Sequence, residues 1–188
     1  SYFDNSEFAA TGTPSPEELK LLEPLRSKLP KEVFGPAWQA PISDGSGQDR
    51  KNLREAAQLL KSAGWEIKDG KLVDAKGIVF TLEFLMQDPS YERMAAPWVQ
   101  SMQRLGIQLN MRAIDSAQYI RLLRSFDYDV VYSGWGQSSS PGNEQRSYFS
   151  SAAADNPGGR NWPGIKDPAV DALIEAVVQA QSRADLIV

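Results

Sequence analysis

The sequence contains neither cysteine nor histidine among its 188 residues. Without cysteine there are no disulfides or thiol nucleophiles, and without histidine there are no imidazole bases or His-based zinc sites. No apolar run reaches about 18 residues, so no transmembrane helix is predicted. The net charge is −4 and basic residues do not cluster, which argues against a nucleic-acid partner. We expect no cofactor and no bound metal.

The composition is typical of a globular protein, with 41% hydrophobic and 23% charged residues. This composition favours a folded domain over disorder, and the length suits a single domain. No signal peptide opens the sequence at Ser1, and no Gly or Pro closes the last helix before Val188, so we expect a fragment of a larger protein. We assign residues 1–48 to an irregular and helical segment that packs on a lobe, and residues 49–188 to that α/β lobe.

Local signals predict the elements of the first half. Ser15 and Glu18 form a capping-box pattern that opens a helix over residues 15–29, which Pro24 should kink or shorten. Asp49 is placed to cap the next helix and Gly64 to end it. The pair Asp69-Gly70 predicts a type I′ turn between two short strands.

From residue 79 the apolar pattern alternates between strand and helix. Strands are predicted at residues 79–87, 107–113 and 128–134, the last apolar enough to be central. Ser90 and Ser116 open the intervening helices. Their expected apolar faces are Met94, Trp98, Met102 and Leu105 in the first, and Tyr119, Ile120, Leu123 and Phe126 in the second. This alternation predicts a mostly parallel sheet. Residues 135–166 show no period, and Asp167 caps a final helix.

Ligands of open parallel sheets collect outside the carboxyl ends of the strands. The segment after the third strand begins with an aromatic side chain and continues with amides and hydroxyls, a combination typical of ligand sites. The predicted ligand-binding residues are Trp135, Gly136, Gln137, Ser138, Ser139, Asn143, Glu144 and Arg146, with Gln87 and Asp88 after the first strand. The alternative is that Trp135 fills the core and the polar run is a solvated loop.

Several motifs resemble a known family. Residues 52–65, Asn52-Leu-Arg-Glu-Ala-Ala-Gln-Leu-Leu-Lys-Ser-Ala-Gly-Trp65, resemble a helix and its ending in extracellular solute-binding proteins of family 5, and so do Arg104-Leu105-Gly106-Ile107 and Gly134-Trp135. Within the family, Ser140-Pro141-Gly142-Asn143-Glu144-Gln145-Arg146 resembles the Yej-type branch, which is associated with oligopeptides and microcin C. The resemblance covers nearly the whole chain.

The resemblance implies a periplasmic receptor of an ABC importer, with two lobes that close around a ligand. This chain would be most of the C-terminal lobe, of the periplasmic binding protein type II-like fold, with a mostly parallel sheet flanked by helices. The implied ligand is an oligopeptide or peptide-like compound, the implied docking partner is the membrane permease, and we expect a monomer without catalysis. Relatives for an opine, a sugar or a nickel complex share the architecture and remain alternatives.

One departure from the family concerns the peptide amine. Several peptide-binding relatives carry an Asp a few residues after the Gly-Trp pair, whereas this sequence has Gln137 and Ser138 there. A buried ammonium needs a charged or strongly hydrogen-bonding partner. Glu144 could substitute, or the amine is blocked, or the other lobe reads it.

Enzyme and metal alternatives rest on weaker patterns. Gly136-x-Ser138 approaches a hydrolase nucleophile elbow, but Ser140 replaces the second Gly and no His can act as base. The pair Asp127 and Asp129 would serve glycosidase chemistry only in a cleft, and we expect Asp129 to be structural. Residues 44–49 space carboxylates as a calcium loop does, yet Asp49 stands where that loop needs Gly, so we expect a turn before a helix.

Overall fold

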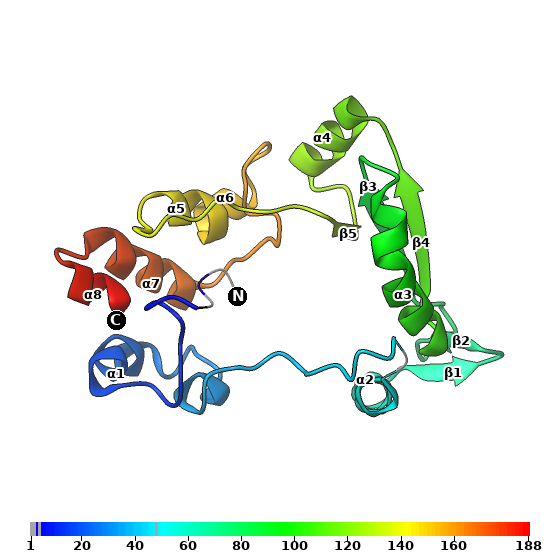
Figure 1. Cartoon of the computed structure of the whole chain (residues 1–188), viewed down its shortest axis with the longest axis horizontal. Helices are drawn as coiled ribbons and strands as arrows, with labels where there is room; N and C mark the ends of the chain where they lie inside the picture. Colours follow the sequence, from blue (N-terminus) through cyan, green and yellow to red (C-terminus); the bar gives the residue numbers. More distant parts are fainter. Residues whose placement is uncertain (1–2, 4, 48) are drawn as a thin grey trace. The chain divides into compact units, whose positions relative to one another are not determined.

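A computed structural model describes residues 3, 5–47 and 49–188 (Figure 1). The chain divides into two compact units. The first combines residues up to Gln39 with Gly134–Val188, and the second is Ala40–Ser133. Within the part of the chain that the structure describes, no helix has the length and apolar character needed to cross a membrane. The predicted division at residue 48 stays a prediction.

The second unit contains a parallel three-stranded sheet. Its strands are β3 (Thr81–Met86), β4 (Gln108–Ala113) and β5 (Val130–Val131), in the order β4-β3-β5. The parallel arrangement is confirmed, but the prediction that the third strand is central is wrong, because β3 holds that place. The ladder between β3 and β5 covers two residue pairs, and beyond it the carboxylate of Asp129 accepts the backbone N–H of Glu83 at 2.8 Å. The apolar character of residues 128–134 instead reflects packing of Tyr128 and Val131.

Two helices cover the faces of β3. Helix α3 (Tyr91–Arg104) packs on Phe84 and Met86, whereas α4 (Ser116–Ser125) packs on Leu85, which is fully buried. Side chains alternate between the faces of a strand, so consecutive residues of β3 enter two different cores. This arrangement fixes the carboxyl end of β3, and Figure 1 shows the sheet with α3 lying along it.

The buried faces of both helices match the prediction in part, since Leu105 and Tyr119 are buried as predicted. In α3 the buried residues are Ala95 and Val99, while Met94 is 60% exposed. In α4, Leu122 is buried with Tyr119, whereas Ile120 is 45% exposed. In each case an apolar position next to the predicted one faces the sheet. Periodicity alone could not predict this, because several adjacent positions of each helix are apolar.

The caps of these helices also differ. Ser90 precedes α3 but its side chain makes no capping hydrogen bond. Asp115, and not Ser116, caps α4 by accepting the N–H groups of Ala117 and Gln118. A carboxylate at this position satisfies two of the N–H groups that an α-helix leaves unpaired at its start.

A hairpin and a further helix complete the second unit. Helix α2 (Arg50–Ser62) begins at Asp49, which accepts the N–H of Asn52 as predicted. Strands β1 (Glu66–Lys68) and β2 (Lys71–Val73) are antiparallel. Positive φ angles of 51° at Asp69 and 75° at Gly70 confirm the type I′ turn.

The first unit consists of short helices. They are α1 (Pro16–Leu22), η1 (Glu23–Leu25), η2 (Lys31–Phe34), α5 (Glu144–Phe149), α6 (Ser151–Ala154), α7 (Pro168–Gln179) and α8 (Arg183–Ile187). The capping box of Ser15 and the cap of Asp167 are confirmed. The predicted helix over residues 15–29 is shorter, because Pro24 lies in a 3₁₀ turn.

Two other predictions for this unit are wrong. Residues 135–166 contain α5 and α6, and α7 is not the last helix because α8 follows it. The irregular remainder is ordered by Asn161, which is fully buried. Its Nδ2 donates to the carbonyl oxygens of Ser150 and Ile165, both at 2.9 Å, and its Oδ1 accepts the N–H of Ile165. One side chain therefore satisfies three backbone groups that regular structure would otherwise pair.

Candidate functional site

Trp135 begins the polar segment and is anchored in an aromatic cluster. Its ring centroid lies 5.0 Å from that of Trp162, 5.4 Å from Phe149 and 6.4 Å from Tyr148. The indole Nε1 donates to the carbonyl oxygen of Arg160 at 2.8 Å. The side chain is half-buried, so the cluster fixes the indole while part of it stays accessible. Trp135 thus packs in the aromatic cluster and also leaves part of its indole ring accessible to a ligand.

The loop that follows Trp135, residues 136–143, is held in place by side chains of α5. The amide Nε2 of Gln145 donates to the Oε1 of Gln137 at 2.8 Å, and the hydroxyl of Tyr148 donates to the carbonyl oxygen of Gly136 at 3.3 Å. Ser138 accepts the N–H of Ser140 through its Oγ. Gln145 and Tyr148 are both buried, so the loop rests on a fixed polar support.

Glu144 contributes to the shape of the same loop. Its Oε1 accepts the N–H of Gly142 at 2.9 Å and the side-chain amide of Gln145 at 3.2 Å. Partial burial opposes ionisation of Glu144, but the hydrogen bonds from Gly142 and Gln145 outweigh it and hold the pKa of the carboxyl below its usual value. Glu144 is therefore a carboxylate that closes a turn.

The guanidinium of Arg146 is likewise engaged within the protein. It donates to the carboxylate of Glu175 at 2.6 and 2.7 Å, and also to the Oδ1 of Asn143. These contacts connect α5 to α7. The structure thus places Asn143, Glu144 and Arg146 next to one another, in a network that supports the loop.

Gln87 and Asp88 lie in the other unit, directly after β3. Asp88 is exposed, and its Oδ1 accepts the N–H of Ser90 at 2.8 Å, which lowers the pKa of the carboxyl. The structure brings the other eight predicted residues together in the first unit. All ten assignments as ligand-binding residues stay predictions.

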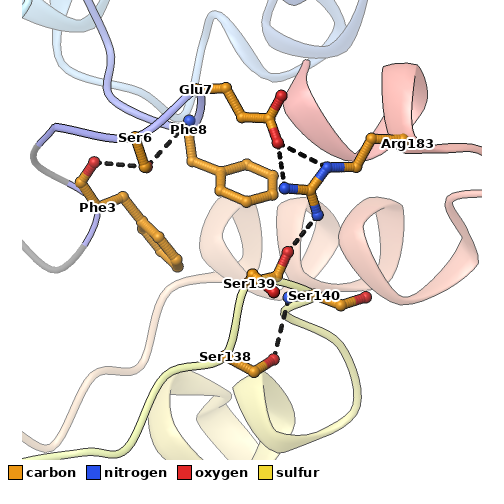
Figure 2. Close-up of polar contacts among 8 residues, drawn as sticks. All are labelled: Phe3, Ser6, Glu7, Phe8, Ser138, Ser139, Ser140 and Arg183. Carbon is orange, nitrogen blue, oxygen red and sulfur yellow. Dashed lines mark hydrogen bonds and ion pairs between the residues drawn. The ribbon is translucent and has the colours of Figure 1, made fainter.

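A groove of about 440 Å³ opens beside the loop, within the first unit. Figure 2 shows polar contacts among residues of its lining. Its volume falls within the range of small-ligand sites, roughly 300–1,000 Å³. Its lining combines the start of the chain, the loop and the first residue of α8. These residues are Phe3, Ser6, Glu7, Phe8, Gln137, Ser138, Ser139 and Arg183.

Three of the lining residues were predicted from the sequence and five were not. The five missed residues lie at the two ends of the chain, Arg183 being 176 positions from Glu7. No local pattern in the sequence connects such distant segments. The opposite charges of Glu7 and Arg183 and the rings of Phe3 and Phe8 were the only available signals, and many other pairs in the sequence share them.

The residues of the enzyme and metal alternatives have structural partners. Asp129 accepts the N–H of Glu83, and Asp49 accepts the N–H groups of Asp44 and Asn52 at 3.1 and 2.9 Å. No group of three or more acidic side chains that could hold a metal is found among residues 3, 5–47 and 49–188. Asp49 therefore belongs to a turn before a helix, as the sequence predicts.

Comparison with known proteins adds evidence about descent. Residues 25–157 match the family model described as bacterial extracellular solute-binding proteins, family 5 middle. The uncharacterized protein y4wM of Sinorhizobium fredii is 43% identical over 188 residues, which are 100% of this chain and 28% of that protein. The probable peptide-binding protein YejA of Agrobacterium fabrum is 41% identical over 184 residues, 97% of this chain and 30% of that protein. The chain spans about three tenths of the length of these relatives.

Solved structures agree with this relationship at the level of the fold. The oligopeptide-binding protein AppA from Bacillus subtilis, solved with a nonapeptide, has a TM-score of 0.61 and 22% identity, covering 71% of this chain and 27% of that chain. The likeness confirms the predicted fold class, an α/β fold with a mostly parallel sheet flanked by helices. The chain belongs to the bacterial extracellular solute-binding proteins of family 5.

Proposed function

We propose that this chain forms most of the C-terminal lobe of a longer periplasmic receptor, which delivers oligopeptides or peptide-like compounds to the permease of an ABC importer. Membership of family 5 and the coverage of about three tenths of each relative support a lobe of a larger protein. The probable peptide-binding activity named for YejA supports the ligand class. On this proposal residues 1–48 pack on the lobe formed by residues 49–188, and the receptor is a monomer.

The observation that carries the proposal is the rigid support of the loop after Trp135. Residues 136–139 are exposed or half-buried, while Gln145 and Tyr148 beneath them are buried and hydrogen-bonded to them. A site that is formed before the ligand arrives loses less conformational entropy on binding. Backbone groups and the accessible part of Trp135 would then hold an extended peptide with little dependence on its side chains.

The groups of the described loop that support binding do not include a base beside Ser138, the serine of the near nucleophile elbow. Ser138 accepts a backbone N–H from Ser140, and the sequence has no imidazole to remove its proton. YejA and AppA are both described as binding proteins. We infer that bound peptides leave the receptor unchanged, which mass spectrometry of released ligand would test.

Titration calorimetry of the full-length receptor with mixed peptides tests the site. Replacing Trp135 and Gln137 together by Ala should weaken peptide binding by at least about tenfold, because an aromatic wall and a hydrogen-bonding amide are lost. The matched control replaces Trp38 and Gln39, also in the first unit, where Trp38 is 80% exposed. Binding that survives the first double substitution unchanged would remove the loop from the site.

A further inference from the structure

Arg183 connects the two walls of the groove beside the loop. Its Nε donates to the Oε1 of Glu7 at 2.7 Å, its Nη2 donates to the same oxygen, and its Nη1 donates to the carbonyl oxygen of Ser139. The guanidinium also lies 4.5 Å from the centroid of the Phe8 ring. Figure 2 shows Arg183 between the start of the chain and the loop. One side chain therefore sets the separation of the two walls.

The wall formed by the start of the chain is aromatic. The rings of Phe3 and Phe8 lie 5.3 Å apart at an interplanar angle of 59°, and both line the groove. Ser6 completes the turn between them, donating to the carbonyl oxygen of Phe3 at 2.6 Å and accepting the N–H of Phe8 at 3.2 Å. Because these two bonds pair the Ser6 hydroxyl, the carbonyl oxygen of Phe3 and the N–H of Phe8 within the protein, the two phenyl rings are the apolar surface that this wall offers to a ligand.

The opposite wall is polar and belongs to the proposed peptide site. Gln145 engages the Oε1 of Gln137, and in the described part of the chain the Nε2 of Gln137 has no protein acceptor, so it can donate to a ligand. Ser138 accepts the N–H of Ser140 and retains a hydroxyl proton to donate. These donors suit the carbonyl oxygens of a peptide main chain.

Among the described residues that line the groove, the charged ones are Glu7 and Arg183, which form an ion pair and neutralise each other. A charged ligand side chain would meet two phenyl rings and a pair that is already satisfied, which does not repay its desolvation. An apolar side chain would instead gain contact with both rings.

We infer that this groove is a side-chain subsite that takes an apolar, preferentially aromatic, residue of the bound peptide, and that Arg183 is the positioning residue that holds its walls together. The inference rests on the proposed function, and it adds a preference that the loop alone does not provide. The peptide main chain binds Gln137 and Ser138, while one side chain enters between the rings of Phe3 and Phe8 and the loop.

The chain supplies a matched control for this arrangement. Arg26 forms a bidentate ion pair with Glu23 and lies 3.6 Å from the centroid of the Phe34 ring. The same three residue types therefore meet at a second place in the first unit, and none of them lines the groove. Substitutions there reproduce the loss of an Arg–Glu–Phe contact without touching the groove.

The test measures dissociation constants of the full-length receptor for trialanine and for tripeptides that carry Phe or Lys at one of the three positions. At one of the three positions, the tripeptide that carries Phe should bind at least about tenfold tighter than trialanine. The tripeptide that carries Lys at that position should show no such gain. Phe3→Ala and the double variant Phe3→Ala/Phe8→Ala should reduce the preference for Phe to about threefold or less, with trialanine binding retained. Arg183→Ala should do the same, and Arg183→Lys should restore only part of the preference, because an ammonium cannot reproduce the forked contact.

The Arg26→Ala and Phe34→Ala controls should keep the full preference. The ratio of the two dissociation constants is the deciding quantity, since a variant that merely loses stability changes both constants together. A wild-type receptor that binds all the peptides equally, or a Phe3→Ala variant that keeps the preference, would overturn the subsite and leave the proposed function standing. Failure of the wild-type receptor to bind any peptide would overturn both.

Discussion

Arg146 and Glu175 form a bidentate ion pair, with N–O distances of 2.7 and 2.6 Å, that joins α5 to α7. The hydrogen bond from Arg146 holds the pKa of the Glu175 carboxyl below its usual value. Arg146 is among the predicted ligand-binding residues, and its donors face the side chains of Glu175 and Asn143. These contacts support the loop that precedes α5, and the ligand-binding role of Arg146 stays a prediction.

Glu175→Gln should lower the melting temperature at pH 7, and the difference from wild type should shrink on acidification. A carboxyl whose folded-state pKa is depressed contributes stability above its unfolded pKa, near 4.5, and loses that contribution as the pH falls through the folded value. Melting curves from pH 7 to pH 3 measure this. Glu55→Gln, on the exposed side of α2, is the control, and a difference that persists at pH 3 would assign the effect to packing.

Asn161→Ala should destabilise the first unit by at least about 2 kcal/mol, because three buried backbone groups lose their partner at once. Urea unfolding of the chain measures the change. Asn156→Ala, an exposed asparagine nearby in sequence, should stay within about 0.5 kcal/mol of wild type. Equal effects of the two substitutions would show that the Asn161 network contributes nothing.

Local interactions explain which elements could be predicted from the sequence. Ser15, Asp167 and Asp69-Gly70 act on groups two or three residues away, so their roles follow from spacing alone. The central position of β3 depends on a choice among distant partners, and its interaction with Asp129 spans 46 positions. The same limit applies to the site. The loop followed from a rule about strand ends, whereas the groove requires both ends of the chain.

Gly106→Ala should cost about 1–3 kcal/mol more than Gly64→Ala, because two effects add at Gly106. Both glycines have positive φ, 77° and 90°, which strains any other residue. A Cβ at Gly106 would also lie 2.7 Å from the backbone nitrogen of Leu72, whereas a Cβ at Gly64 meets open space. Urea unfolding of both variants measures the difference, and equal costs would mean that the hairpin moves aside freely.

Trp135→Phe should separate the packing role of Trp135 from a role at the ligand. A phenyl ring can remain in the cluster with Phe149 and Trp162, and loss of the indole hydrogen bond to Arg160 should cost about 1 kcal/mol of stability. If the accessible part of the indole contacts the ligand, peptide affinity of the full-length receptor should fall by about tenfold. Trp162→Phe is the matched control, since it alters the same cluster and should leave the affinity within about twofold of wild type. Equal losses of affinity in the two variants would instead mean that Trp135 acts only by packing, as the alternative reading of the sequence holds.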